Sequence, residues 1–270
     1  MNTAIFCEYQ DVATGAVPLV CIHGWGMNLR VFDPLRNALR ADFGSWALDL
    51  PGHGRSDWHD GRAGFESQIQ DVQAVLPAQC VIVGWSLGGQ LALELARRAP
   101  QQVRALALIT STPRFIQSED WPQGLEAATV HAFDALLAQD WRQTLRDFVQ
   151  LQVRGGRDAD STRQKLEAAL EAHGLPRAAA LRAGLEILTG LDQRAGLARV
   201  LQPTLVLSGQ NDRVTPPAAA RWMAQALPNA RYRQIARAGH APLLSHVDEV
   251  AEAIRGFMSD LRCGDEGVAA

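Results

Sequence analysis

The chain lacks the features that mark several large classes of protein. Only four of its 270 residues are cysteine, no two of them stand in a C-x-x-C spacing, and no cluster of histidines accompanies them, so zinc is not expected. A net charge of −3 argues against nucleic acid as the main partner. No apolar run is long enough to span a bilayer, and the first residues lack the basic start of a signal peptide. We therefore expect a cytoplasmic protein, and no motif implies a metal or an organic cofactor.

Strand and helix patterns alternate along most of the chain. Apolar runs of strand length occur at residues 17–22, 46–50, 80–83, 105–110 and 203–209. Helical patterns lie between most of them, and a chain with 47% hydrophobic residues can bury a substantial core. Such alternation is typical of a mostly parallel sheet covered by helices on both faces. The sequence therefore predicts an α/β fold.

One stretch interrupts this alternation. Between residues 113 and 188 the strand patterns vanish, and helical patterns occur at residues 125–137, 141–153, 161–172 and 177–188. We interpret residues 113–188 as a helical cap, or lid, inserted into the fold. The core is then expected to comprise residues 1–112 and 189–263, with a closing helix over 247–261. Residues 264–270 are expected to form a disordered tail.

The stretch CVIVGWSLGG at residues 80–89 carries the clearest chemical signal. A buried-strand pattern leads into a match to G-x-S-x-G at residues 84–88, and helical spacing follows. This context predicts a sharp turn that holds Ser86 at the end of a strand and close to a helix N-terminus, where Gly84 and Gly88 let the backbones pass closely. An ordinary Gly-Ser turn is the alternative. The order strand, turn and helix favours a nucleophile.

A nucleophilic serine needs a base and an acid that orients it. His240 follows the last predicted strand, a short one at residues 232–235, in Gly-His-Ala-Pro, and Asp212 follows the strand before it, at residues 203–209. A turn-forming role for Asp212 stays open, and Asp49 is the other carboxylate with a comparable position at a strand end. The order Ser86, Asp212, His240 is that of α/β-hydrolases. We expect His240 to be the general base and Asp212 to hold its tautomer.

Two backbone N–H groups are candidates for binding an oxyanion. One belongs to Leu87, directly after the nucleophile, and the other to Trp25, in the loop after an early strand. His23, next to that loop, is expected to brace it. His173, in a helical context, is expected at the surface.

Several segments together resemble a known family. HGWGMN, DLPGHGRS, GWSLGG and GHAP are similar to motifs of the α/β-hydrolase superfamily, and the similarity covers nearly the whole chain. STPRF, EDWPQG, FVQLQ, GLEIL and HAPLLSH resemble the pimeloyl-acyl-carrier-protein methyl ester carboxylesterases of biotin biosynthesis. The resemblance implies a serine esterase with Ser86, Asp212 and His240 as its triad. It would remove a methyl group from a pimeloyl chain attached to acyl carrier protein.

The resemblance also assigns residues of the cap. It implies that the FVQLQ segment lines the acyl channel, with Phe148, Val149, Gln150, Leu151 and Gln152 as its residues. It implies further that cap arginines dock the acidic carrier protein, the candidates being Arg142, Arg146, Arg157 and Arg163. Ordinary helix packing is the alternative for the FVQLQ segment, and a solvated helical face is the alternative for each arginine.

Two other functions remain open from the sequence. A broad short-acyl carboxylesterase without a carrier partner would share the fold and the triad. A non-catalytic receptor with a hydrolase fold is the second alternative, although such proteins usually lose a member of the triad or the oxyanion loop. No large exposed apolar seam is apparent in the sequence, so a monomer is expected.

Overall fold

A seven-stranded sheet forms the centre of the molecule in the computed structural model, which describes residues 4–11 and 17–266. Its strands are β1 (Cys7–Gln10), β2 (Leu19–Ile22), β3 (Ser45–Leu48), β4 (Cys80–Trp85), β5 (Val103–Ile109), β6 (Thr204–Gly209) and β7 (Ala230–Ile235). The spatial order is β1-β3-β2-β4-β5-β6-β7. Strand β1 runs antiparallel to β3, and the other neighbours run parallel. The predicted α/β fold with a mostly parallel sheet is confirmed.

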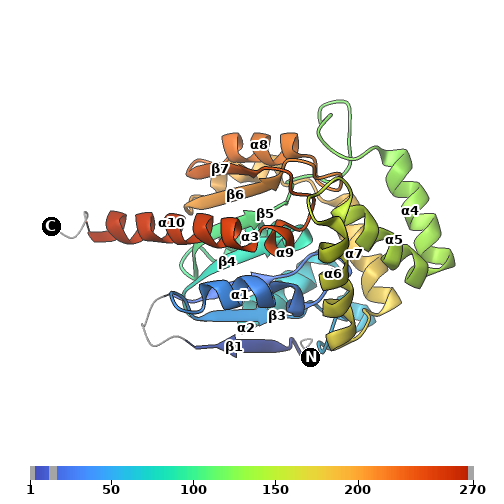
Figure 1. The fold of residues 1–270 in the computed structure, drawn as a ribbon, viewed down its shortest axis with the longest axis horizontal. Helices are drawn as coiled ribbons and strands as arrows, with labels where there is room; N and C mark the ends of the chain where they lie inside the picture. The colour runs from blue at the N-terminus through green and yellow to red at the C-terminus, as the bar shows by residue number, and fades with distance from the viewer. Residues whose placement is uncertain (1–3, 12–16, 267–270) are drawn as a thin grey trace.

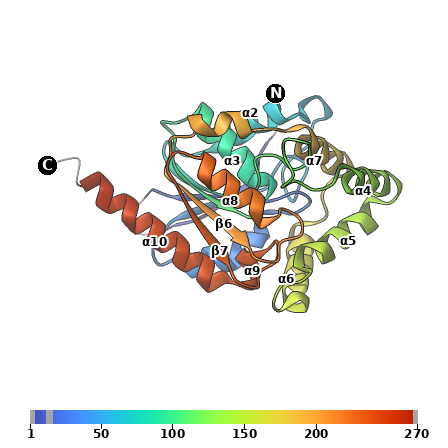
Figure 2. The same ribbon diagram turned by 90° about the horizontal axis from the view of Figure 1, so that it is seen from above.

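Helices cover both faces of this sheet. They are α1 (Asp33–Leu39), α2 (Phe65–Val75), α3 (Leu87–Arg98), α8 (Pro217–Ala226), α9 (Pro242–Ser245) and α10 (Val247–Glu266). Figure 2 shows α2 and α3 on one side of the sheet and α10 on the other. Short 3₁₀ helices lie at Leu29–Phe32, Asp60–Arg62 and Arg194–Arg199. None of the helices in the described part of the chain combines the length and apolarity that a membrane span requires.

The closing helix is longer than predicted. It continues past Leu261 to Glu266, so residues 264–266 are helical rather than part of the predicted tail. The prediction ended this helix at Leu261 and placed Gly264 in the tail, but a glycine within a helix costs only about 1 kcal/mol relative to alanine. The remainder of the predicted tail, residues 267–270, lies outside the described residues.

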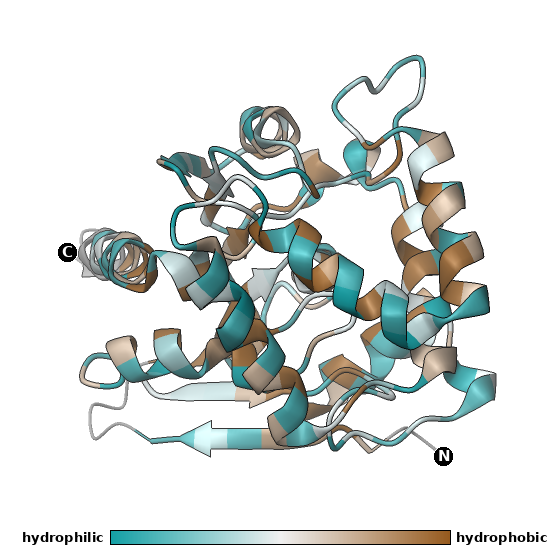
Figure 3. Ribbon diagram, turned by 45° about the vertical axis from the view of Figure 1, so that its right-hand side comes forward, coloured by the Kyte–Doolittle hydropathy of each residue, from teal (hydrophilic) through white to brown (hydrophobic). Residues whose placement is uncertain are grey.

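Four helices that follow β5 in the sequence group together at one end of the molecule (Figure 1). They are α4 (Ala127–Gln139), α5 (Trp141–Val153), α6 (Ala159–His173) and α7 (Ala178–Gly190). We call these four helices the cap. Figure 3 shows that the cap helices carry both hydrophobic and hydrophilic residues, which is the composition of helices with one packed face. The division into a core of 1–112 and 189–263 and a cap of 113–188 stays a prediction.

The central strands are buried on both faces, as the apolar runs predict. All residues of β2, β4 and β6 are buried. Cys21 and Cys80 lie inside β2 and β4, where burial raises the pKa of each thiol to about 12. Both therefore remain protonated and pack as small hydrophobic side chains, as predicted.

Candidate active site

Ser86 occupies a strained turn between β4 and α3. Its φ of 55° lies in the left-handed region, which non-glycine residues rarely adopt. A Cβ atom on Gly84 would lie 2.6 Å from the carbonyl oxygen of Gly88, and one on Gly88 would lie 2.1 Å from that of Ile22. Both positions therefore require glycine. The strand, the turn and the helix predicted from the sequence are present, and the turn sets Ser86 at the N-terminus of α3.

His240 and Asp212 form a buried pair. His240 Nδ1 lies 2.8 Å from Asp212 Oδ2, and the two side chains are 1% and 0% exposed. The other carboxylate oxygen of Asp212 accepts from the N–H groups of Val214 and Thr215. Asp212 is therefore a turn residue through Oδ1 and a partner of His240 through Oδ2, so the two roles left open by the sequence occur together. A carboxylate only accepts hydrogen bonds, so the hydrogen of the neutral imidazole lies on Nδ1.

The second ring nitrogen of His240 is available for proton transfer. Nε2 is buried and makes no hydrogen bond within the described residues. The indole N–H of Trp85, the residue before Ser86, donates to the carbonyl of His240 at 2.9 Å, and the Trp85 and His240 rings are 5.7 Å apart. Chain segments from the ends of β4 and β7 thus meet at one place. Hydrogen bonds between a nucleophile and its base are often long before substrate binds.

The loop after β2 passes directly beside Ser86. A Cβ atom on Gly24 would lie 3.0 Å from the Cβ atom of Ser86. Trp25 follows in this loop and its indole N–H donates to the carbonyl of Leu181 on α7. Leu87 opens α3, where the helix dipole favours negative charge. The two residues proposed to bind an oxyanion therefore flank Ser86 from different elements.

His23 braces this loop, as predicted. Its Nδ1 lies 2.8 Å from the carbonyl of Gly24, and its Nε2 accepts from the N–H of Leu50. Burial lowers the pKa of His23 to about 4, so the ring is neutral near pH 7. A neutral ring can donate at one nitrogen and accept at the other, and both contacts need this state.

An apolar pocket opens at Ser86. Its lining comprises Ser86, Trp25, Phe115, Leu125, Thr129, Val130, Phe133, Phe148, Leu151, Leu185, Leu188 and Val214. Most of these side chains come from the cap, and the pocket is suited to a chain of methylene groups.

Only part of the predicted acyl-channel segment, residues 148–152, lines the pocket. Phe148 and Leu151 line it, because residues three apart share one face of α5. Val149 and Gln152 are buried but do not line the pocket, and Gln150 is exposed on a groove on the outside of the cap. The remaining lining from α4, α7 and the chain before α4 was not identified from the sequence, although Leu185 and Leu188 fall in the GLEIL segment.

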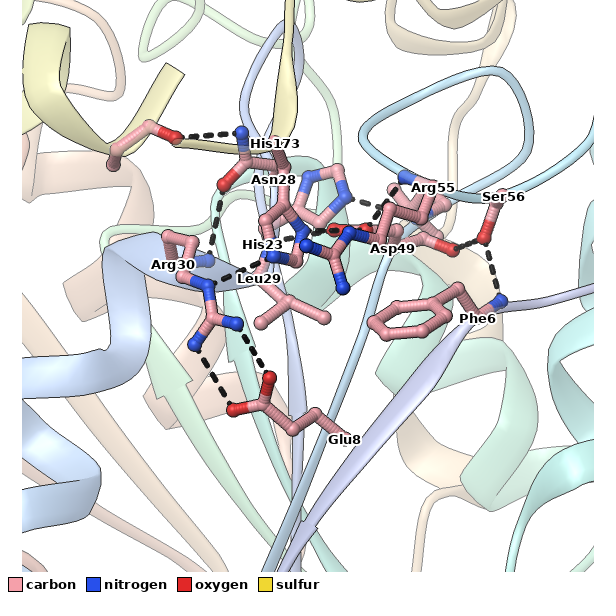
Figure 4. Close-up of polar contacts among 12 residues, drawn as sticks. Phe6, Glu8, His23, Asn28, Leu29, Arg30, Asp49, Arg55, Ser56 and His173 are labelled. Atoms are coloured by element: carbon pink, nitrogen blue, oxygen red, sulfur yellow. Dashed lines mark hydrogen bonds and ion pairs between the residues drawn. The ribbon is translucent and has the colours of Figure 1, made fainter. Parts of the chain in front are cut away.

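Asp49 lies in a different polar network (Figure 4). Its carboxylate accepts from the N–H groups of Leu29 and Arg55 and contacts Nδ1 of His173 at 3.1 Å. These contacts occupy both of its oxygens and give it a partner other than His240. The expected surface position of His173 is wrong, because its side chain is 1% exposed and joins cap helix α6 to the core.

The candidate docking arginines lie on the outside of the cap. Arg142 and Arg146 are exposed on α5, where Arg142 stacks over the ring of Trp141. Arg157 is exposed between α5 and α6, and Arg163 on α6 pairs with Glu167. Within the ranges 4–11 and 17–266, no three His, Cys, Asp or Glu residues cluster as a metal-binding group would require.

Comparisons with known proteins agree with this architecture. A sequence model of the alpha/beta hydrolase fold family matches residues 17–247. The pimeloyl-[acyl-carrier protein] methyl ester esterase of Nitrosomonas europaea is 42% identical over 238 residues, which cover 87% of this chain and 94% of that protein. The protein of the same name from Xanthomonas campestris pv. campestris is 40% identical over 251 residues, which cover 93% and 98% of the two chains.

Solved structures with the same fold are more distant in sequence. A bromoperoxidase from Bacillus anthracis superposes with a TM-score of 0.86 at 21% identity, covering 95% of this chain and 96% of that one. An esterase from Exiguobacterium antarcticum superposes with a TM-score of 0.84 at 22% identity, covering the same shares of the two chains. These two likenesses concern the fold alone.

Proposed function

This chain belongs to the α/β-hydrolase family and, within it, to the pimeloyl-[acyl-carrier protein] methyl ester esterases, and we propose that it hydrolyses the methyl ester of a pimeloyl chain carried on acyl carrier protein. The reaction frees the pimeloyl carboxylate for biotin biosynthesis. The observation that carries the proposal is the apolar pocket that opens at Ser86. The Asp212–His240 pair supports it, because Trp85, the residue before Ser86, donates to the carbonyl of His240. A serine nucleophile in the lining of an apolar pocket suits an ester on a methylene chain.

We infer the chemistry from the roles proposed for Ser86, Asp212 and His240. Ser86 Oγ attacks the ester carbonyl while His240 Nε2 takes the hydroxyl proton, and Asp212 stabilises the imidazolium that forms. The backbone N–H groups of Leu87 and Trp25 bind the oxyanion of the tetrahedral intermediate. His240 then returns the proton to the departing methoxide, so methanol leaves and an acyl-serine remains.

Water completes the cycle by the same route. His240 takes a proton from the water as it attacks the acyl-serine, and the proton passes to Ser86 when the carboxylate is released.

We propose that the carrier protein docks on the outside of the cap, where Arg142 and Arg146 are exposed. We propose further that the esterase acts as a cytoplasmic monomer.

One experiment tests the proposed substrate. Pimeloyl methyl ester on acyl carrier protein is compared with a short p-nitrophenyl ester, for the wild-type enzyme and for Ser86→Ala. We expect turnover of the carrier-linked ester that vanishes in the variant. Turnover of the small ester alone would leave a general carboxylesterase. No turnover of either ester, together with a Ser86 that does not react with a fluorophosphonate, would contradict esterase function altogether.

A further inference from the structure

Thr110, at the end of β5, has a backbone conformation that its side chain disfavours. Its φ is 42°, in the left-handed region, and the residue is fully buried. A β-branched residue is strained there, and such strain persists only where the surrounding contacts enforce it. Its N–H donates to the carbonyl of Leu207 on the neighbouring strand β6 at 2.7 Å. The strain therefore lies in a segment that the sheet holds firmly.

The strained conformation directs Thr110 toward both proposed partners of the nucleophile. Its hydroxyl donates to the carbonyl of His240 at 2.8 Å. Its own carbonyl accepts from the hydroxyl of Thr215 at 2.9 Å, and Thr215 lies in the loop that carries Asp212. One residue directly after β5 thus contacts the loop of the base through its side chain and the loop of the acid through its backbone.

The Thr215 hydroxyl lies within the Asp212–His240 pair. It is 2.8 Å from Asp212 Oδ2 and 3.4 Å from His240 Nδ1, and the residue is 3% exposed. Asp212 Oδ2 is the same atom that accepts from the imidazole. A hydroxyl has a single hydrogen, and both the carboxylate and the Thr110 carbonyl can only accept. That hydrogen is shared between the two oxygens.

We propose that Thr110 and Thr215 are positioning residues for the Asp212–His240 pair. Thr110 fixes the peptide of His240, and Thr215 shares the carboxylate oxygen that holds the imidazole. The proposal rests on ester hydrolysis at Ser86 as the proposed function. It adds two residues that act through others rather than on the substrate.

The backbone of His240 is held on three sides. Its carbonyl accepts from both Thr110 Oγ1 and Trp85 Nε1, and its N–H donates to the carbonyl of Gln152. Loss of the Thr110 hydroxyl leaves the hydrogen bond from Trp85 Nε1 as the remaining one to the His240 carbonyl among the described residues. The imidazole then has more freedom to leave the orientation in which Nε2 receives the proton from Ser86.

The Thr215 hydroxyl also sets the basicity of the imidazole. A donor to Asp212 Oδ2 stabilises the negative charge there, so the carboxylate attracts the imidazolium less strongly. Removing this donor strengthens that attraction and favours the imidazolium over the neutral ring. Among the described residues that contact the imidazole ring of His240, Asp212 is the one charged group. Trp85, Thr110, Gln152 and Thr215, which contact His240 from four elements or loops, are uncharged.

The first test compares Thr215→Val with Thr215→Ser, using the pH profile of kcat/KM on a p-nitrophenyl ester. For Thr215→Val we expect the acid limb to move up by about half a unit to one unit, the size of one hydrogen bond. We expect the plateau to fall roughly three- to tenfold. Thr215→Ser keeps the hydroxyl and should retain the wild-type limb. A role in folding alone would lower the rate equally at every pH.

The second test compares Thr110→Ala with Thr110→Ser. Neither variant is β-branched, so they differ at this site in the hydroxyl alone. We expect Thr110→Ala to lower kcat roughly three- to tenfold with KM unchanged, and Thr110→Ser to stay near the wild-type kcat. Equal kcat values for the two variants would overturn the role of Thr110. An unmoved acid limb in Thr215→Val would overturn that of Thr215.

Failure of the inference is distinct from failure of the proposed function. Wild-type hydrolysis that Ser86→Ala abolishes establishes the reaction at Ser86. If the threonine variants then match the wild type, only the positioning role is wrong. A wild-type protein that hydrolyses no ester contradicts the proposed function and removes the basis of the inference with it.

Discussion

The backbone N–H of His240 donates to the carbonyl of Gln152 at 2.9 Å, so the last turn of cap helix α5 holds the residue that we propose as the base. Two further contacts join the segment between cap helices α5 and α6 to the core. The N–H of Arg157 donates to the carbonyl of Arg237, and the side-chain amide of Asn211 donates to the carbonyl of Gly155. The cap therefore supports the loops of both Asp212 and His240, besides lining the pocket.

Gly239→Ala tests this support. A Cβ atom on Gly239 would lie 2.8 Å from the carbonyl oxygen of Gln152, so the loop or α5 must move. Small displacements of a catalytic group can cost on the order of 10²-fold in rate, and we expect kcat to fall by at least about tenfold. Kinetics on a small ester measure this.

The matched control for Gly239→Ala is Gly256→Ala. Gly256 lies in α10 with no atom near its added Cβ, so we expect unchanged kinetics and a gain of up to about 1 kcal/mol in the free energy of unfolding. A Gly239→Ala enzyme with wild-type kcat would show that His240 does not depend on its bond to Gln152.

Asp212→Asn tests the assignment of the acid. The amide of Asn would present either its NH₂ group or a weaker acceptor to His240 Nδ1. The imidazole would then no longer be held in the tautomer that leaves a lone pair on Nε2. By analogy with serine proteases we expect kcat to fall about 10⁴-fold. Asp49→Asn is the control, because Asp49 contacts Leu29, Arg55 and His173 rather than His240. It should lose stability but keep kcat. The reverse pattern would make Asp49 the acid.

The sequence was sufficient where one local pattern fixes a position. Ser86 follows from a turn that only glycine neighbours permit, and helix α5 was predicted with its observed bounds of Trp141–Val153. In α5 the side chain of Asp140 caps the first turn, and apolar residues recur at helical spacing. His240 and Asp212 follow their strands in a known order, so their loops could be identified without knowing the packing.

The sequence was insufficient where a contact joins distant segments. The Asp49–His173 contact spans 124 positions, and no local pattern of His173 distinguishes it from a surface residue of α6. Thr110 and Thr215 follow two strands and belong to no recognisable sequence motif. Only the sheet order β5-β6 makes them neighbours of His240. The pocket lining depends likewise on how the cap helices pack.

The buried pair His23 and His53 should make stability depend on pH. Burial lowers the pKa of His23 to about 4, and burial together with the neighbouring His23 lowers that of His53 to about 3. In the unfolded chain both titrate near 6.5. Between about pH 6.5 and pH 4 the unfolded state binds protons that the folded state does not, so stability falls as the pH falls. Each proton contributes up to about 1.4 kcal/mol per pH unit.

Urea unfolding at several pH values between 7.5 and 4.5 measures this dependence. In His53→Asn the side-chain amide can replace the donor that His53 Nδ1 offers to the carbonyl of Pro51. We expect this variant to lose stability less steeply than the wild type as the pH is lowered through this range. Parallel slopes for the two proteins would show that His53 is not titrated on unfolding.

Reversing two charges on the cap separates docking of the carrier from chemistry. Arg142 and Arg146 are exposed on α5, and neither lines the pocket at Ser86. We expect Arg142→Glu with Arg146→Glu to lower kcat/KM for the carrier-linked ester at least about tenfold at low salt, because like charges slow encounter with an acidic protein. The effect should shrink as salt rises. Turnover of a small ester should be unchanged, since the site itself is untouched.

The control for this pair must change the net charge equally but away from the cap. Arg199 and Arg221 are exposed on the core, at the end of the 3₁₀ helix Arg194–Arg199 and within α8, and reversing both provides that change. If docking uses the cap surface, the core reversal leaves the carrier-linked rate within about twofold of wild type while the cap reversal does not. Equal losses in both double variants would mean that overall charge, rather than a surface on α5, governs the encounter. Equal losses on the small and the carrier-linked ester would place the effect of Arg142 and Arg146 in the structure of the cap and not in recognition of the carrier.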